Sequence, residues 1–264
     1  MSFTRRLCLT AAAVAFALVA APAAFAQTKL VIGAYPANPP WEAKNDKGEF
    51  EGFEVDLVKE IAKRVGATPE ISDMGFQALF AATVSQRIDA AISTITITKE
   101  RLQSQSFTQA YYDSDMALAT RGDKVKKLTD LKGATLGVLS SSTGETWVKT
   151  NTEKYGIAGM RGYAAQQDLL LDLQAGRIDG AVSDLPGMQF AFQKMKELTI
   201  AEVIPTGDQY GIMMRKGHPM LEKVNDAITA MKKDGTIAAL HKKWLGADAG
   251  PSTSSVQERP LPKP

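Results

Sequence analysis

The stretch RIDAAIS at residues 87–93 returns as RIDGAVS at residues 177–183. A segment with the apolar spacing of an amphipathic helix precedes each copy, over 76–86 in the first case and 168–175 in the second. Each copy also ends in a short apolar strand. The repeat therefore predicts two lobes built from one strand–helix–strand unit, each with a mostly parallel sheet.

A second pair of similar segments supports the division into two lobes. Residues 30–33 (LVIG) and 135–138 (TLGV) are predicted to be strands that open the two halves of the chain. Alternation of such strands with amphipathic helices is typical of α/β proteins, and 264 residues are enough for two separate cores. Further helices are predicted over residues 53–65, 143–155, 221–233 and 237–244.

The N-terminus has the pattern of a secretory signal peptide. Two arginines precede a mostly apolar run over 7–21, and an Ala-x-Ala cleavage site ends at Ala26. We therefore expect residues 1–26 to be removed on export; the alternative is an uncleaved N-terminal anchor. Cys8, the single cysteine, lies in this segment, so the mature chain can form neither a disulfide nor a thiolate metal site.

The charge balance excludes one class of partner. The whole chain has 31 lysines and arginines and 29 acidic residues, and the two numbers become equal once the two arginines of segment 1–26 are removed. A neutral chain without basic clusters gives no electrostatic basis for binding nucleic acid. Residues 247–264 are rich in Gly, Pro, Ser and Ala and are predicted to form a disordered tail.

The ends of the two repeated strands predict where a ligand binds. In open α/β sheets, ligands bind beyond the carboxyl ends of the strands. The repeat places Ser93 and Thr94 at that end of one lobe, and Ser183 and Asp184 at that end of the other. Two such ends that face each other form a cleft with walls from different lobes, so that one bound ligand can bridge them.

The segment 93–101 (STITITKER) has the features of a carboxylate-binding site. Hydroxyl side chains, Thr94 and Thr96 among them, follow the strand end, and Thr98 is suited to cap a helix with Arg101 in its first turn. A cation at a helix N-terminus opposes the helix dipole unless an anion is bound there. Arginine can bind a carboxylate with two parallel hydrogen bonds, and free backbone N–H groups add to this. The alternative is an ordinary surface arginine on a solvated helix.

Asp184 supplies the complementary charge. A carboxylate at the opposite strand end, without a basic neighbour in the sequence, suits an ammonium group; the alternative is a loop acid that caps a turn before Pro186. Arg101 and Asp184 together would bind the two charges of a zwitterion, which predicts an α-amino acid site. Thr143 begins the first helix of the second lobe, where it can cap the helix, donate to the ligand carboxylate, or do both.

The side-chain part of the predicted site is less well defined. Tyr35, Asn38 and Trp41 follow the first strand, and Phe76 precedes the first repeat helix. An aromatic ring at these positions can stack on a ligand or pack in the core. We expect Trp41 to pack and Phe76 to contact the ligand, with Tyr35 and Asn38 as further candidates.

These residues resemble those of the family 3 bacterial extracellular solute-binding proteins, the receptors for polar amino acids in ABC importers. The resemblance runs from about Leu30 to Gly246 and is carried by several motifs. They are Gly48 with GFEVDL at 52–57, RIDAAIS at 87–93, TITKER at 96–101, LKG at 131–133 with Gly137 and Val138, and DGT at 234–236 with KWLG at 243–246.

The resemblance implies a type II periplasmic binding protein fold, in which two α/β lobes are joined by hinge strands near residues 115–120 and 209–215. Lobe 1 would comprise 27–116 with a return over 213–246, and lobe 2 would comprise 117–212. The resemblance further implies a periplasmic, monomeric, non-enzymatic receptor without a cofactor or metal. Such a receptor binds a free amino acid or a close derivative and passes it to an inner-membrane ABC permease.

The resemblance also implies which residues hold the ligand. The amino-acid backbone would contact Ser93, Thr94, Thr96, Arg101, Thr143 and Asp184, with Leu139 beside them. Two departures concern the ligand side chain, since Asn38 stands where relatives often have an aromatic platform and Tyr35 where receptors for basic amino acids have an acid. Lysine, arginine and histidine are therefore disfavoured as ligands, unless Glu42, Glu145 or Asp168 replaces the missing acid.

Two other functions occur on similar folds. A cyclohexadienyl dehydratase would need a general acid with a raised pKa at the leaving hydroxyl, whereas Asp184 is assigned to an ammonium group and no second acid stands out. An extracellular sensor domain would need a following transmembrane helix, where we expect the disordered tail. His218 and His241 are isolated in the sequence, are expected on the surface, and give no indication of a metal site.

Overall fold

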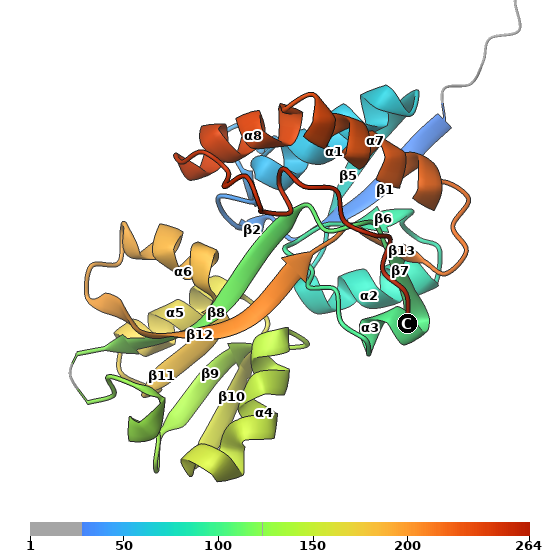
Figure 1. Cartoon of the computed structure of the whole chain (residues 1–264). Coiled ribbons are helices and arrows are strands. Elements are labelled where there is room, and N and C mark those ends of the chain that lie inside the picture. The colour runs from blue at the N-terminus through green and yellow to red at the C-terminus, as the bar shows by residue number, and fades with distance from the viewer. Residues whose placement is uncertain (1–27, 123) are drawn as a thin grey trace, which may run out of the picture.

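The computed structural model describes residues 28–122 and 124–264, and the predicted signal peptide lies outside them. The described residues form two lobes, each with a five-stranded sheet flanked by helices, and two long strands run between the lobes (Figure 1). The two-lobed α/β fold predicted from the sequence is therefore confirmed. Within the described residues, none of the helices combines the length and the apolar character that a membrane span requires.

The sheet of lobe 1 contains, in spatial order, β5 (Ala67–Asp73), β1 (Thr28–Ala34), β6 (Ala90–Ala91), β13 (Met213–Arg215) and β7 (Gln105–Phe107). β1 is parallel to β5 and β6, whereas β13 is antiparallel to β6 and β7. All strands except β13 therefore point the same way. β13 runs against them because it is the strand that returns from lobe 2.

The sheet of lobe 2 contains, in spatial order, β10 (Gly159–Tyr163), β9 (Thr135–Leu139), β11 (Gly180–Asp184), β8 (Tyr112–Arg121) and β12 (Leu198–Tyr210). β9 is parallel to β10 and β11, and β8 is antiparallel to β11 and β12. β8, which arrives from lobe 1, is thus the reversed strand of this sheet. Both sheets are mostly parallel, as predicted. In each sheet the one antiparallel strand is the strand by which the chain enters the lobe, β13 in lobe 1 and β8 in lobe 2.

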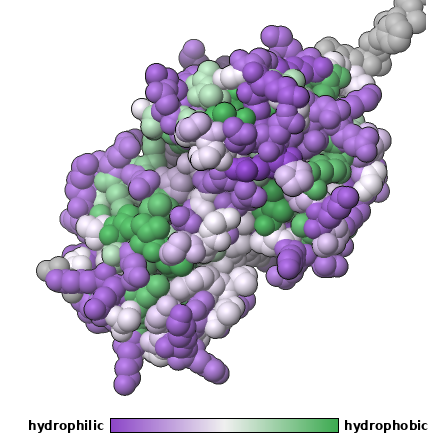
Figure 2. All heavy atoms as spheres, in the orientation of Figure 1, coloured by the Kyte–Doolittle hydropathy of each residue, from purple (hydrophilic) through white to green (hydrophobic). Residues whose placement is uncertain are grey.

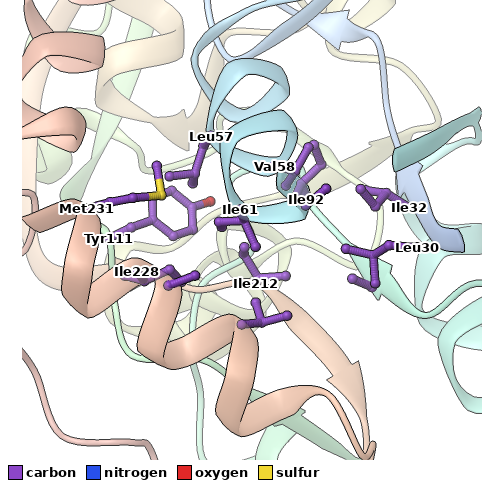
Figure 3. Packing of buried hydrophobic residues seen from close by; sticks show 14 of the residues in the cluster. Leu30, Ile32, Leu57, Val58, Ile61, Ile92, Tyr111, Ile212, Ile228 and Met231 are labelled. Carbon is purple, nitrogen blue, oxygen red and sulfur yellow. The ribbon is translucent and has the colours of Figure 1, made fainter. Parts of the chain in front are cut away.

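The helices cover both faces of each sheet. In lobe 1 they are α1 (Phe53–Arg64), α2 (Phe76–Val84), α3 (Arg101–Ser104), α7 (Leu221–Lys233) and α8 (Thr236–Leu245); in lobe 2 they are α4 (Thr143–Tyr155), α5 (Gln166–Gln174) and α6 (Leu185–Phe192), with a 3₁₀ turn at Leu128–Asp130. α1, α7 and α8 share one core with β1, and α2 packs on the opposite face. Figure 3 shows side chains of α1, β1 and α7 in the first core, among them Ile61, Leu30 and Ile228.

Lobe 2 has the same three layers. Along β8, Met116 and Leu118 face the core under α4, while Ala117 and Ala119 face the core under α5 and α6. This alternation is what a strand buried on both faces requires. The outer surface is mostly polar in the view of Figure 2, with smaller apolar patches on both lobes.

The sequence repeat corresponds to a structural repeat. Asp89 Oδ2 accepts a hydrogen bond from the Val31 N–H at 2.8 Å, and Asp179 Oδ2 accepts one from the Thr135 N–H at the same distance. The strands that follow are β6, parallel to β1, and β11, parallel to β9. Each repeated aspartate therefore ties its own strand to the strand that opens its lobe.

The crossing between the lobes is the antiparallel pair of β8 and β12. The predicted hinge segments near 115–120 and 209–215 lie along β8 and from the end of β12 to β13. The boundary predicted at 116/117 falls inside β8, and the one at 212/213 falls where β13 begins. The division into 27–116, 117–212 and 213–246 stays a prediction, because β8 runs continuously through one of these boundaries.

The expectation of a disordered tail over 247–264 is wrong for its central part. Ser254 and Ser255 are fully buried. The Ser254 N–H donates to Asp113 Oδ2 at 2.7 Å, and the Ser255 hydroxyl donates to the Tyr111 carbonyl at 3.0 Å. The segment lacks regular structure, but its small polar side chains satisfy backbone and carboxylate groups near the start of β8. Composition alone does not indicate such tertiary contacts.

Two further elements were not predicted. A small sheet of β2 (Ala37–Asn38), β3 (Glu42–Lys44) and β4 (Phe50–Glu51) follows β1. Pro186, interpreted as part of a loop, lies in the first turn of α6, where proline is well tolerated because the N–H it lacks would have no partner there.

Candidate functional site

A cavity lies between the two lobes and is lined by residues of both. Part of this cavity is open to solvent. All ten residues predicted as ligand contacts line it: Tyr35, Asn38, Phe76, Ser93, Thr94, Thr96 and Arg101 from lobe 1, and Leu139, Thr143 and Asp184 from lobe 2. Six lining residues were not among them, namely Trp41, Ser142, Gly144, Gln166, Ser183 and Gly187. The sequence thus predicted the walls of one cavity, and the role of these residues as ligand contacts stays a prediction.

The lobe 1 wall contains a strained turn at Ser93 and Thr94. Their φ angles are 146° and 48°, in the region that favours glycine. The Tyr35 N–H donates to the Ser93 hydroxyl at 2.9 Å, and the Thr94 N–H donates to the carboxylate of Glu54. Both turn residues are buried. These bonds hold the turn so that its backbone borders the cavity.

Arg101 connects the two walls. Its backbone N–H donates to the Thr98 hydroxyl at 3.1 Å, but the short helix α3 begins only at Arg101, so Thr98 closes the turn before the helix and does not occupy the N-cap position itself. Its guanidinium donates to the Thr96 carbonyl at 2.8 Å and, across the cleft, to the Ser141 carbonyl at 3.0 Å. The guanidinium carbon also lies 4.9 Å from the centre of the Phe80 ring. Burial lowers the pKa of Arg101 to about 10, so the side chain is still a cation at neutral pH.

Asp184 lies at the end of β11 and begins α6, yet its side chain makes no capping bond to the helix. This disfavours the alternative of a simple capping acid. Its Oδ2 instead accepts a bond from the Thr94 hydroxyl of lobe 1 at 3.4 Å. Burial, followed by the charge of Asp208, raises the pKa of Asp184 to about 7. A positive group beside this carboxylate would offset the cost of its burial.

The N-terminus of α4 faces the same cavity. Ser142, not Thr143, caps this helix, because the Ser142 hydroxyl accepts from the Glu145 N–H at 3.1 Å. The capping role considered for Thr143 is therefore wrong, and its side chain is left to line the cavity. At Gly144 a Cβ would lie 2.7 Å from the Val182 carbonyl oxygen, so glycine lets the helix start close to β11. The free N–H groups of this first turn favour an anion.

The aromatic residues divide between packing and lining. Trp41 is fully buried and contacts Phe53 and Tyr112 edge to face, which is the predicted packing role, and it also lines the cavity. The Tyr35 hydroxyl accepts a bond from the Gln166 N–H of lobe 2 at 3.0 Å. With the bonds from Arg101 to Ser141 and from Thr94 to Asp184, this contact joins the two lobes in a closed arrangement.

The acids considered as substitutes in the side-chain pocket do not line the cavity. Glu42 is buried behind it, and Asp168 is exposed. Glu145 accepts a bond from the Ser141 N–H at 2.6 Å and pairs with Lys149. Asp184 is therefore the single acid among the described residues that line the cavity.

Sequence reasoning missed two acids around the cavity, Glu54 and Asp208, and considered Glu42 only as a possible part of the side-chain pocket. Glu54 and Glu42 lie beneath the Ser93–Thr94 turn, and Asp208 of β12 has a buried Oδ2 without a hydrogen-bond partner among the described residues. Burial raises the pKa of Asp208. For Glu54 a signal was available, because it lies four residues before Val58 and seven before Ile61, on the apolar face of α1.

The histidines differ from expectation in one respect. His218 is buried, with 8 % of its surface exposed, and its Nε2 lies 3.3 Å from Asp89 Oδ1. In the part of the chain that the structure describes, no group of three or more His, Cys, Asp or Glu side chains could hold a metal ion.

Comparison with known proteins identifies the family of this chain. Residues 30–247 match the model of the bacterial extracellular solute-binding proteins, family 3. The chain belongs to this family. The resemblance inferred from the motifs is thereby confirmed, and with it the expectation of a solute-binding protein.

Individual relatives of this family 3 chain are amino-acid-binding proteins. The L-cystine-binding protein of Escherichia coli is 32% identical over 224 residues, which cover 83% of each chain. The histidine-binding periplasmic protein of Salmonella typhimurium is 32% identical over 254 residues, covering 88% of this chain and 94% of the relative. Among solved structures, an ancestral arginine-binding protein bound to arginine has a TM-score of 0.78 and 33% identity, covering 82% of this chain and 97% of that one.

Proposed function

We propose that this chain is the amino-acid receptor of an ABC importer. In this proposal it is a periplasmic monomer without enzymatic activity, which binds one free α-amino acid or a close derivative in the cleft and presents it to an inner-membrane permease. Its relatives, which include a histidine-binding periplasmic protein and an L-cystine-binding protein, support this role. The predicted signal peptide supports export.

One observation carries the proposal: a buried cation from lobe 1 and a buried acid from lobe 2 border the same cavity. Arg101, with Thr96 and the N-terminus of α4, would bind the ligand carboxylate. Asp184, with the Ser93–Thr94 turn, would bind the ammonium group. Each charge-assisted hydrogen bond contributes on the order of 1.5–3 kcal/mol, so a few suffice for the ~8 kcal/mol of micromolar binding.

The ligand would act by stabilising the closed arrangement. Its two charged groups contact different lobes, so it binds the closed form more tightly than the open form and shifts the population toward closure. The hydrogen bonds that already join the lobes show which surfaces meet on closure. The permease would then recognise the closed receptor.

The cavity favours a neutral polar side chain. The groups near Asn38, Gln166 and Ser183 are uncharged donors and acceptors, and no acid stands among the lining residues besides Asp184. We therefore expect glutamine or a similarly polar amino acid to bind better than lysine or arginine. A related solved structure is an ancestral arginine-binding protein bound to glutamine.

A thermal-shift screen of the mature protein against the common L-amino acids and L-cystine tests the proposal, because a ligand that binds only the folded state raises the melting temperature. Arg101→Met and Asp184→Asn should each weaken the affinity of the best ligand at least ~10-fold. Calorimetric titration measures this, and the melting temperature of the ligand-free variants should not fall.

Lys99→Met and Asp46→Asn are matched controls, since both side chains are exposed and should leave affinity unchanged. Retained affinity in Arg101→Met and Asp184→Asn would contradict the assignment of the site. The raised pKa of Asp184 is also what a general acid needs, so incubation with prephenate or arogenate is the matching check. We expect no aromatic product.

A further inference from the structure

Two glutamates lie beneath the Ser93–Thr94 turn without lining the cavity. Glu42 of β3 and Glu54 of α1 are both fully buried. A buried carboxyl group is tolerated only when hydrogen bonds or a proton compensate for the loss of water. The binding role proposed for the cleft does not by itself require either residue.

Both carboxylate oxygens of Glu54 face the same backbone N–H. The nitrogen of Thr94 lies 2.9 Å from Oε1 and 3.1 Å from Oε2, and the Tyr111 hydroxyl donates to Oε1. Gly52, with φ 135°, lets α1 begin directly against Trp41, since a Cβ there would lie 2.2 Å from the Trp41 carbonyl oxygen. Glu54 is therefore a fixed acceptor for the turn.

Glu42 reaches the same threonine through Asn38. The Asn38 amide nitrogen lies 3.3 Å from Glu42 Oε1 and 3.3 Å from Thr94 Oγ1, so it can donate to both. Thr94 Oγ1 in turn lies 3.4 Å from Asp184 Oδ2 on the opposite lobe. Burial, followed by the charge of Glu54, raises the pKa of Glu42 well above its ordinary value.

We propose that Glu42 and Glu54 form a positioning pair that holds Thr94 in its left-handed conformation and so fixes the ammonium-binding side of the cleft. The inference rests on the proposed function, because it concerns the same cavity. Thr94 is β-branched, and such a residue keeps a φ of 48° only when its surroundings hold it. Glu54 holds its N–H, and Glu42 holds its hydroxyl through Asn38.

A double-mutant cycle between Glu54 and Asp184 tests this pair. The mature full-length protein is titrated calorimetrically with L-glutamine, L-histidine, L-arginine and L-cystine. Glu54→Gln keeps the shape of the side chain but replaces one acceptor oxygen with a donor, so affinity for the probes that bind should fall at least ~10-fold. In the Asp184→Asn background, Glu54→Gln should reduce the affinity by a clearly smaller factor, because both residues act on one ammonium contact.

Two matched variants sharpen the cycle. Glu42→Gln keeps a side-chain oxygen that can accept from the Asn38 amide, and its loss of affinity should stay below ~3-fold. Glu51→Gln changes an exposed glutamate of β4 and should leave affinity unchanged. If Glu54→Gln does not fold, Glu54→Asp replaces it, since aspartate keeps the charge but not the reach and should still lose at least ~5-fold.

The outcomes separate this inference from the proposed function. If Asp184→Asn weakens binding but the Glu54 variants bind normally, the pair has only a structural role and the inference is overturned alone. The same holds if Glu54→Gln and Asp184→Asn have independent, multiplying effects. If Asp184→Asn binds normally, or no probe binds to the unaltered protein, the result contradicts the proposed function and also the inference that rests on it.

Discussion

The two walls of the cleft come from one repeated unit but end in different chemistry. Up to Ser93 and Ser183, both copies share their strand pairing and their aspartate contact. Beyond that point lobe 1 turns through Thr94 in a left-handed conformation, whereas lobe 2 passes from Asp184 directly into α6. The scaffold is therefore repeated, while the groups that line the cavity differ between the lobes.

Burial also affects the charged residue of each wall differently. It lowers the pKa of Arg101 to about 10, which leaves the guanidinium charged at neutral pH. It raises the pKa of Asp184 to about 7, so this carboxyl is partly protonated under the same conditions. The lobe 1 wall therefore presents a constant charge, and the lobe 2 wall presents a titrating one.

The largest expected effect is a pH dependence of ligand affinity that comes from lobe 2 alone. Below pH 7 Asp184 binds a proton that an ammonium ligand must displace, so affinity should fall about 20-fold between pH 7.5 and pH 5.5. Calorimetric titration across this range with the best ligand from the amino-acid screen measures the effect.

Two variants show whether this pH dependence belongs to Asp184. Asp184→Asn should abolish it, and Asp208→Asn should move its midpoint to lower pH, because the charge of Asp208 helps to raise the pKa of Asp184. A pH profile that Asp184→Asn leaves unchanged would assign the titration to another group.

Local sequence signals predicted much of the fold. α4 and α7 have the predicted bounds. α4 follows a run of serines and ends just before Gly156, and α7 ends just before Asp234 and Gly235. α6 was missed because Pro186 was interpreted as a loop signal. The packed segment around Ser254 could not be predicted, since its partners on β8 are far away in the sequence.

The walls of the site were predictable because the repeat aligned two strand ends. That alignment brought Arg101 and Asp184 to one cavity from opposite halves of the chain. The hydrogen bonds of the buried glutamates Glu42 and Glu54 behind the lobe 1 wall were not predicted. Asn38 was chosen as a ligand contact, whereas its bonds to Glu42 and Thr94 depend on how β3 and α1 pack in three dimensions.

A second, smaller effect is a loss of stability when a glycine of the opening strand is replaced. Gly33 packs against Ile88 in lobe 1, and Gly137 packs against the corresponding Ile178 in lobe 2. A Cβ on Gly33 would lie 2.7 Å from Ile88 Cδ1, and one on Gly137 would lie 2.3 Å from Leu169 Cδ1 and 2.5 Å from Ile178 Cδ1. Gly33→Ala and Gly137→Ala should both destabilise the protein by about 1–3 kcal/mol, with Gly137→Ala the worse because its contacts are closer. Chemical denaturation measures this. A neutral Gly137→Ala would show that lobe 2 packs less tightly than lobe 1.

The smallest expected effect tests whether the two scaffolds are energetically equivalent. Asp89→Asn and Asp179→Asn each remove a carboxylate that accepts from the opening strand of its lobe, so each should cost about 1 kcal/mol and lower the melting temperature by roughly 2–4 °C. Hydrogen bonds from Lys124 and Thr135 lower the pKa of Asp179, so its contribution is present above the ordinary aspartate pKa and is lost on acidification below it. Ligand affinity at pH 7 should be unchanged in both variants, because neither side chain lines the cavity. A loss of affinity in only one variant would mean that the aspartate contact of that lobe also affects the geometry of the cavity wall, whereas the contact of the other lobe does not.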